Sequence, residues 1–185
     1  MGLPLVLGGT SPLSLFGWTD ASLGTGPRRR SVLGNISALG PTSGAIQAKA
    51  TTSTATCLSC FEAELDGLTT MLKTLLRLRH ILRELLPDFP TQSHIFSDNE
   101  ALVNFINSDT PFTKGVRHVE MRQYFTRDTL LKGEFKLEHI KGTEHQQFTR
   151  QILGLSLLDS TDPPIPSEAL PNLGSISPTL AQIFK

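Results

Sequence analysis

Three acidic side chains lie at positions where a metal-dependent reaction could take place. Asp20 ends a strand-like stretch in "GWTDAS", Asp98 ends another in "IFSDNEALVNFI", and Glu64, with Glu62, opens a long helical pattern. In α/β proteins, sites form outside the carboxyl ends of the strands, so acids from three separate elements could meet there. Clustered carboxylates repel and raise one another's pKa unless a cation lies between them, and Mg²⁺ prefers such oxygen ligands.

The same acids also have a purely structural explanation. Asp98 could be the N-cap of the helix that follows it, with Asn99 and Glu100 in the first turn. The two glutamates could simply favour the positive end of their helix, and Asp20 could belong to a turn. Residue spacing alone does not separate these interpretations, because the acids are far apart in the sequence.

The hydrophobic pattern predicts the elements that would position these acids. We expect strands over 14–20, 31–39 and 44–59, the last holding one strand or two. Leucines at three- and four-residue steps predict a helix over 62–86, which Pro87 ends. Beyond it we expect a strand over 93–97, a helix over 99–107, a loop over 108–115, a helix over 116–133 and a strand over 134–140. This order predicts an α/β domain with a mixed sheet.

Length and composition fit a globular domain with few charges. The chain has 185 residues, of which 38% are hydrophobic and 18% charged, enough for one domain with a core. Because 17 basic residues balance 17 acidic ones, the chain lacks the basic excess of a free-standing nucleic-acid binder. Any contact with a phosphate backbone would therefore be local, weak or shared with another domain. Without an apolar run of membrane-spanning length or a charged leader, we expect an intracellular protein with no membrane partner.

Changes in composition suggest three regions along the chain. Residues 1–12 have the composition of a leader or a truncated edge, 13–155 form the predicted domain, and 156–185 are a Pro-, Ser- and Leu-rich tail. Cys57 and Cys60 form a lone Cys-x-x-Cys without a second pair or a histidine at metal spacing. We therefore expect no zinc site and interpret them as small core and surface residues.

Five motifs follow one another between about residues 16 and 150: "GWTDAS", "PRRRSVLGNISALG", "STATCLSCFEAELDGL", "IFSDNEALVNFI" and "RHVEMRQYF". In this order they resemble the ribonuclease H domain at the end of copia-type retrotransposon Pol polyproteins. The resemblance implies a ribonuclease H-like fold, a five-stranded mixed sheet flanked by helices. It also implies that Asp20, Glu64 and Asp98 are catalytic, metal-binding acids, with Glu62 in a structural role.

The resemblance further implies an activity and its partners. The family cuts the RNA strand of RNA–DNA hybrids by two-metal-ion hydrolysis, with Mg²⁺ as the expected cofactor and Mn²⁺ as an alternative. In such a site one ion lowers the pKa of a water molecule and the other stabilises the leaving oxygen. The hybrid would be recognised by its shape and its 2′-hydroxyls. A reverse transcriptase domain in the parent polyprotein is a second expected partner.

Basic residues supply candidates for phosphate contacts, although the arginine run at 28–30 could equally be a solvated turn. The candidates are Arg28, Arg29, Arg30, Lys49, Lys114, Arg117 and Arg122. His118 lies one helical turn from Arg122, and we interpret it as a histidine at the edge of the core. We expect the side chains of Trp18 and Tyr124 to pack in the core.

The chain departs from the family where a fourth acid is expected. The family has an Ala-Asp pair before Phe-Thr-Lys, and this pair is missing from "TEHQQFTRQI" at 143–152. Glu144 and His145 are the candidates to replace it. The missing acid leaves two interpretations open, a working nuclease and a catalytically inactive ribonuclease H-like module that binds nucleic acid or supports a polymerase domain. A third, an unrelated α/β interaction domain, would require that the motifs occur by chance.

Overall fold

The computed structural model describes residues 13–40, 43–108 and 117–146. The predicted leader over 1–12 and the tail over 156–185 lie outside these ranges. The elements are β1 (Phe16–Ser22), a 3-10 turn (Pro27–Arg29), β2 (Val32–Ala38), β3 (Ala45–Thr52), α1 (Cys60–Leu85), β4 (Ser93–Ser97), α2 (Glu100–Asn107), α3 (Arg117–Leu131) and β5 (Phe135–His139). None of the helices in the described ranges is long and apolar enough to cross a membrane.

The five strands form one mixed sheet in the order β3-β2-β1-β4-β5, which confirms the predicted α/β class. β1 to β3 pair antiparallel, whereas β4 is parallel to both β1 and β5. The stretch 44–59 holds only one strand. Pairing ends at Ser53, whose backbone N–H donates to the Ser31 carbonyl, and Ser59 already caps the next helix.

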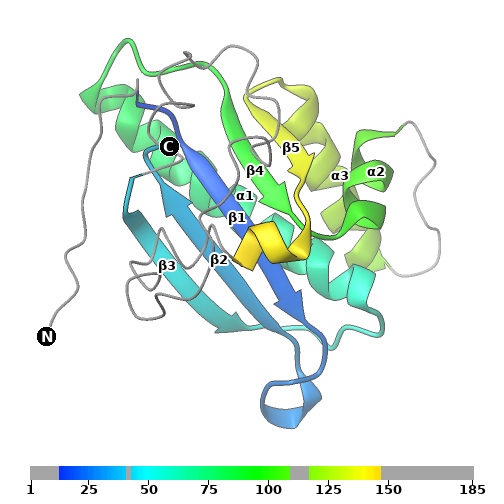
Figure 1. Cartoon of the computed structure of the whole chain (residues 1–185). Helices are drawn as coiled ribbons and strands as arrows, with labels where there is room; N and C mark the ends of the chain where they lie inside the picture. The colour runs from blue at the N-terminus through cyan, green and yellow to red at the C-terminus, as the bar shows by residue number, and fades with distance from the viewer. Residues whose placement is uncertain (1–12, 41–42, 109–116, 147–185) are drawn as a thin grey trace, which may run out of the picture.

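Helix α1 covers one face of the sheet, and a short helical turn over 142–146 lies on the other face (Figure 1). The leucine spacing of α1 forms the main core as predicted: Leu65, Leu68, Leu72 and Leu75 are fully buried together with Met71. Helices α2 and α3 complete this layer beside α1 (Figure 1). The opposite face buries a smaller cluster of Phe16, Trp18, Ala38, Phe96 and Ile140.

The start of α1 is fixed by two hydrogen bonds to side chains. Ser59 Oγ, the N-cap, accepts from the Glu62 backbone N–H at 3.2 Å, and Glu62 Oε2 accepts from the N–H of Leu58, the residue before the cap, at 2.7 Å. The Ser59 bond satisfies a backbone donor that a helix N-terminus otherwise leaves unpaired. Glu62 therefore has a structural role at the beginning of the helix, as the sequence implied.

A glycine lets α1 approach β1 closely. A Cβ atom at Gly67 would lie 3.0 Å from Thr19 Oγ1, closer than most side-chain contacts allow. Because Glu64 lies about one turn before Gly67, this approach brings the glutamate to the end of β1.

Two aromatic residues that were expected in the core have different environments. Trp18 is 2% exposed and packs near Phe16 and Phe96, as predicted. Tyr124 is 50% exposed, so the prediction for it was wrong. The reason is helical phase: α3 turns Gln123 inward, and the next residue along a helix points about 100° away.

Candidate metal centre

Asp20, Glu64 and Asp98 come from three elements and meet at one edge of the sheet. Each offers a carboxylate oxygen, and these oxygens all lie within 4.8 Å of one another. The parallel pairing of β1 with β4 explains part of this arrangement, because Thr19 is paired with Ser97 and each is followed directly by an aspartate. The N-terminal part of α1, which packs on one face of the sheet, adds Glu64. The structure thus brings together the three acids that the sequence singled out.

Glu64 is the most deeply buried of the three acids. It is 6% exposed; its Oε1 accepts from the Ala21 backbone N–H at 3.3 Å, and its buried Oε2 has no hydrogen-bond partner in the described part of the chain. Burial, followed by the charges of Asp20 and Asp98, raises the pKa of Glu64 to about 8, and the Ala21 hydrogen bond opposes this shift. A buried carboxylate in this setting is stable either protonated or beside a cation.

The donor set fits a hard divalent cation. All three ligand atoms are carboxylate oxygens, as Mg²⁺ and Mn²⁺ prefer, and a cation would supply the partner that Glu64 Oε2 lacks. The residue at position 142, which lies beside the cluster, is a glycine. A Cβ atom at Gly142 would lie 3.4 Å from Asp98 Oδ2, so the glycine leaves space next to this carboxylate.

The structural alternative for Asp98 does not match the helix start that is observed. Asn99, not Asp98, is the N-cap of α2, and its Oδ1 accepts from the Leu102 backbone N–H at 2.9 Å. The Asp98 side chain is therefore not used for capping. It remains half-buried beside Asp20 and Glu64.

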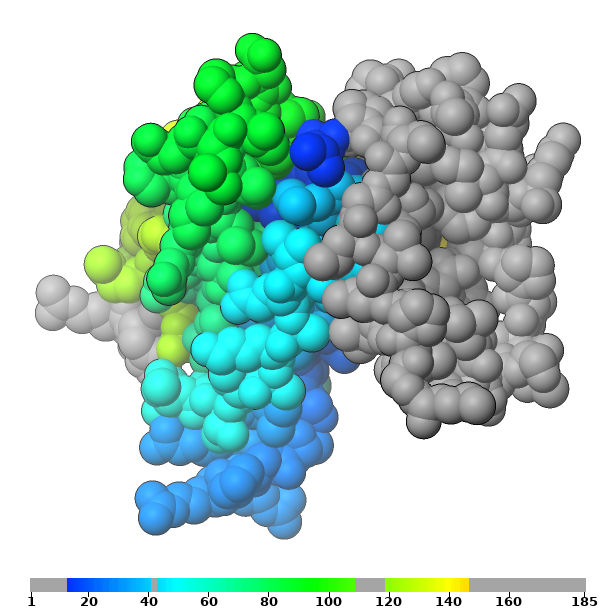
Figure 2. Space-filling model, turned by 90° about the vertical axis from the view of Figure 1, so that its left-hand side faces the viewer, coloured from blue at the N-terminus to red at the C-terminus, as the bar shows by residue number. Residues whose placement is uncertain are grey.

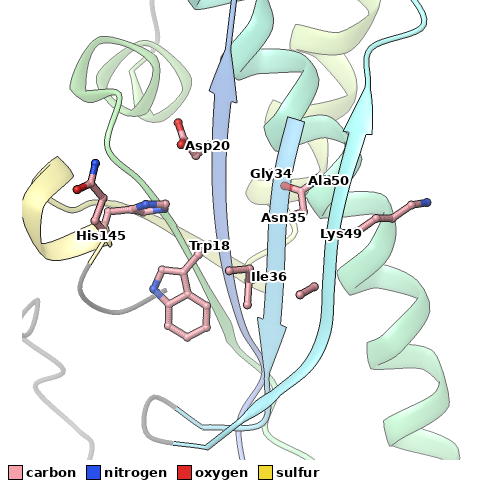
Figure 3. Close-up of a pocket in the computed structure, with 10 residues that line it drawn as sticks. Trp18, Asp20, Gly34, Asn35, Ile36, Lys49, Ala50 and His145 are labelled. Atoms are coloured by element: carbon pink, nitrogen blue, oxygen red, sulfur yellow. The ribbon is translucent and has the colours of Figure 1, made fainter. Parts of the chain in front are cut away.

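His145 lies next to the acids without joining their ligand group. It is 5% exposed, in the turn over 142–146, and neither it nor half-buried Glu144 belongs to the acid cluster found in the described residues. Burial lowers the pKa of His145, whereas Asp98, Asp20 and a hydrogen bond to the Thr19 backbone oppose this shift. Figure 3 shows the ring directed toward the space between Asp20 and Trp18. Neither candidate for the fourth acid therefore completes the carboxylate set.

The turn between β1 and β2 carries the arginine run, and it projects at the lower end of the view in Figure 2. Arg28 and Arg29 are exposed, and both have a backbone φ of 57°, in the left-handed region that residues other than glycine rarely adopt. Arg30 instead donates from Nη1 to the Ser53 carbonyl at 3.3 Å and to the Thr54 carbonyl. Arg30 therefore ties the turn to the end of β3, whereas its two neighbours face solvent.

Arg122 is engaged by a residue that the sequence analysis did not single out. Its Nη2 lies 3.2 Å from Asp66 Oδ1, and Asp66 Oδ2 accepts from the Ser53 hydroxyl. Asp66 is 7% exposed, so this ion pair links α1, α3 and the end of β3 inside the protein. Asp66 and Arg122 lie on different helices, so their contact depends on tertiary packing and no local pattern in the sequence marks it.

The other basic candidates differ in what the structure describes of them. Lys49 is exposed on the edge strand β3. Arg117 is the first residue of α3, but its side chain, like that of His118, lies outside the described part, as does all of Lys114. Their predicted contacts with phosphate therefore stay predictions.

Comparisons with known proteins define the class to which this architecture is similar. A scan against family models and a search of curated proteins both find no match. Among solved structures, many chains match with ribonuclease H folds. The described sheet order, the flanking helices and these matches together establish a ribonuclease H-like fold.

Three of the similar structures illustrate the extent of the match. LC11-RNase H1, isolated from compost by a metagenomic approach, has a TM-score of 0.56 at 12% identity, covering 75% of this chain and 91% of that one. RNase H1 of the halophilic archaeon Halobacterium salinarum gives 0.53 at 11% identity, covering 72% and 89%. The protease–reverse transcriptase of prototype foamy virus gives 0.55 at 12% identity, covering 85% of this chain and 22% of the viral one. LC11-RNase H1 has also been solved in complex with an RNA/DNA hybrid.

Proposed function

We propose that the chain is a ribonuclease H-like endonuclease that hydrolyses the RNA strand of RNA–DNA hybrids with Mg²⁺ or Mn²⁺. The observation that carries this proposal is the convergence of the Asp20, Glu64 and Asp98 oxygens within 4.8 Å on this fold. Support for the substrate comes from LC11-RNase H1 and a foamy viral protease–reverse transcriptase, which have similar folds and have been solved with RNA/DNA hybrids.

In the proposed mechanism the three acids would hold the divalent cations. When bound, such ions supply an activated water and neutralise the charge that develops on the phosphate. The protein's own contribution is to place the ligands. The Ala21 N–H fixes one oxygen of Glu64, and the paired ends of β1 and β4 fix Asp20 and Asp98 side by side. Glu64 would have to lose its proton to bind a cation, because its pKa of about 8 keeps it largely protonated at neutral pH.

Exposed cations near the substrate would add a local attraction that the neutral chain lacks overall. Arg28 and Arg29, which face solvent in a projecting turn, and Lys49, which is exposed on β3, are the described candidates for phosphate contact. Arg30 and Arg122 already bond within the protein, so they would act by holding neighbouring segments.

We also propose that the domain derives from a retrotransposon Pol protein of the copia type and works beside a reverse transcriptase domain. The five ordered sequence motifs support this origin. The similarity to part of a foamy virus protease–reverse transcriptase supports the setting, because the match covers 85% of this chain but only 22% of the viral chain.

A catalytically inactive module that binds nucleic acid or supports a polymerase is the second candidate. It is favoured by a specific observation: the cluster in the described residues holds three acids, and neither Glu144 nor His145 joins them. The zero net charge points the same way, since it gives no general attraction for a phosphate backbone.

Cleavage of a labelled RNA–DNA hybrid tests both candidates. The full chain is incubated with Mg²⁺ or Mn²⁺, and Asp98→Asn is compared with Glu100→Gln, a matched neutralisation two residues away outside the cluster. Metal-dependent cutting that Asp98→Asn abolishes and Glu100→Gln retains would support the nuclease. Absence of cutting by a folded wild-type chain that still binds the hybrid would support the inactive module.

A further inference from the structure

A pocket of about 380 Å³ opens beside the acid cluster, on the sheet face opposite α1 (Figure 3). Strand pairing explains which side chains share this face, because Trp18 is paired with Ile36 and Ile36 with Ala48. One side of the pocket is formed by Trp18, Ile36 and Ala48, and Gly34, Asp20 and His145 lie toward the cluster. Asp20 thus belongs to both the pocket and the acid cluster.

Three residues of this pocket have a buried polar side-chain atom with no hydrogen-bond partner in the described part of the chain. They are Trp18 Nε1, Asn35 Oδ1 and His145 Nε2, in residues that are 2%, 6% and 5% exposed. Asn35 lies between Gly34 and Ile36 on β2, so its side chain points to the other face of the sheet, and the other two atoms are the ones on the pocket face. Leaving such atoms unpaired is costly, so each one indicates a missing partner. The indole N–H can only donate. The ring of His145 has a hydrogen bond to the Thr19 backbone, and Nε2, which has no partner in the described residues, can accept a hydrogen bond when the imidazole is neutral.

The floor of the pocket is flat and apolar, and the polar residues Asn35, Lys49 and Gln146 complete the lining. Gly34, Ala48 and Ala50 project little from the sheet, and Figure 3 shows the Lys49 side chain pointing away from them. A planar ring can lie on such a floor beside Trp18 and Ile36. The volume is at the lower end of the range for small-molecule sites, enough for one ring system with a polar substituent.

We propose that this pocket is a nucleoside subsite beside the acid cluster, which holds the sugar and base of an unpaired nucleotide outside the paired part of the hybrid. A nucleoside combines a planar base for the apolar floor, carbonyl or ring acceptors for Trp18 Nε1 and hydroxyl donors for His145 Nε2. The occupant is unpaired because a base inside a duplex is stacked and cannot enter a pocket without unstacking. The ligand class rests on the proposed nuclease function, whereas the pocket itself does not.

The single tryptophan of the chain provides a direct reporter. Its indole N–H gives one resonance in a ¹H–¹⁵N correlation spectrum, which is followed while uridine is added to the metal-free full chain. A saturable shift of this resonance is expected as the N–H gains an acceptor. The matched variants are Ala48→Leu, which fills the pocket from an exposed floor position, and Gln47→Leu, the same new side chain on the opposite face.

We expect Ala48→Leu to raise the dissociation constant of uridine by at least about tenfold and Gln47→Leu to leave it unchanged. A folded wild-type chain whose indole resonance does not move would overturn the proposal, and so would equal binding by Ala48→Leu. Uridine carries no phosphate and the titration contains no metal, so the result is independent of hybrid cleavage. Binding of uridine without cleavage of the hybrid would support the subsite and contradict the nuclease function. Cleavage without uridine binding would contradict only the subsite.

Discussion

Glu64→Gln should make the metal-free chain more stable at neutral pH, although it removes a carboxylate from the proposed metal centre. In the folded chain the pKa of Glu64 is raised from 4.5 to about 8, first by burial and then by Asp20 and Asp98. In the unfolded chain the residue keeps its ordinary pKa. Folding therefore favours the protonated form, and this contribution to stability is complete below pH 4.5 and is lost as the pH rises through 8.

The magnitude follows from the difference between the two pKa values. At 1.36 kcal/mol per pH unit, the raised pKa of Glu64 lowers the free energy of unfolding, relative to its value at acidic pH, by about 5 kcal/mol above pH 8 and by about 3 kcal/mol at pH 7. Glutamine has nearly the same shape and no charge, so it avoids this cost. We expect the free energy of unfolding of Glu64→Gln to exceed that of the wild type by about 2–3 kcal/mol at pH 7, and by less than about 1 kcal/mol at pH 5.

Urea denaturation of both proteins, with a chelator and at several pH values, measures this difference. Added Mg²⁺ should then stabilise the wild type, because a cation favours the ionised carboxylate, and should have little effect on Glu64→Gln. The reasoning would be refuted by a stability difference that does not grow between pH 5 and pH 9. A variant that is less stable than the wild type at every pH would refute it as well.

Four further substitutions test contacts that hold the helices in place. Arg79→Leu should lower the free energy of unfolding by about 2–4 kcal/mol, because the buried Arg79 guanidinium bonds to hydroxyl and carbonyl oxygens. Arg83→Leu removes only a half-exposed ion pair and should lower it by less than about 1 kcal/mol. Urea denaturation compares the two variants. Ser59→Ala should cost about 1 kcal/mol by uncapping α1, which thermal unfolding detects, and an unchanged midpoint would contradict the cap. Arg122→Gln should cost about 1–2 kcal/mol by leaving Asp66 without its cation, and loss of hybrid affinity at unchanged stability would instead indicate a phosphate contact.

The buried polar links next to the acids suggest how the site keeps its shape. Asp66 follows Glu64 by two residues on α1 and bonds to Ser53 and Arg122, so the helix end that supplies Glu64 is tied to both β3 and α3. The aspartates are fixed by strand pairing. We therefore expect substitutions in the Asp66 pair to change metal affinity less than substitutions of the acids themselves.

The sequence by itself determined the local elements of this protein. Leucines at helical spacing predicted α1 almost to its ends, and "SHIFS" predicted β4 at its observed limits, because periodicity and proline breaks act within a few residues. The fold class followed from the order of these elements. The sequence also named the three acids, since two of them end strands and the third begins a helix.

Only the tertiary structure decided which polar groups face one another. The acids come from positions 20, 64 and 98, and they meet because β1 pairs parallel with β4 and Gly67 lets α1 approach. The same packing tied Arg122 to an internal acid, turned Tyr124 outward and raised the pKa of a glutamate to about 8. Burial and long-range contacts are properties of the assembled chain, and no local pattern of residues encodes them.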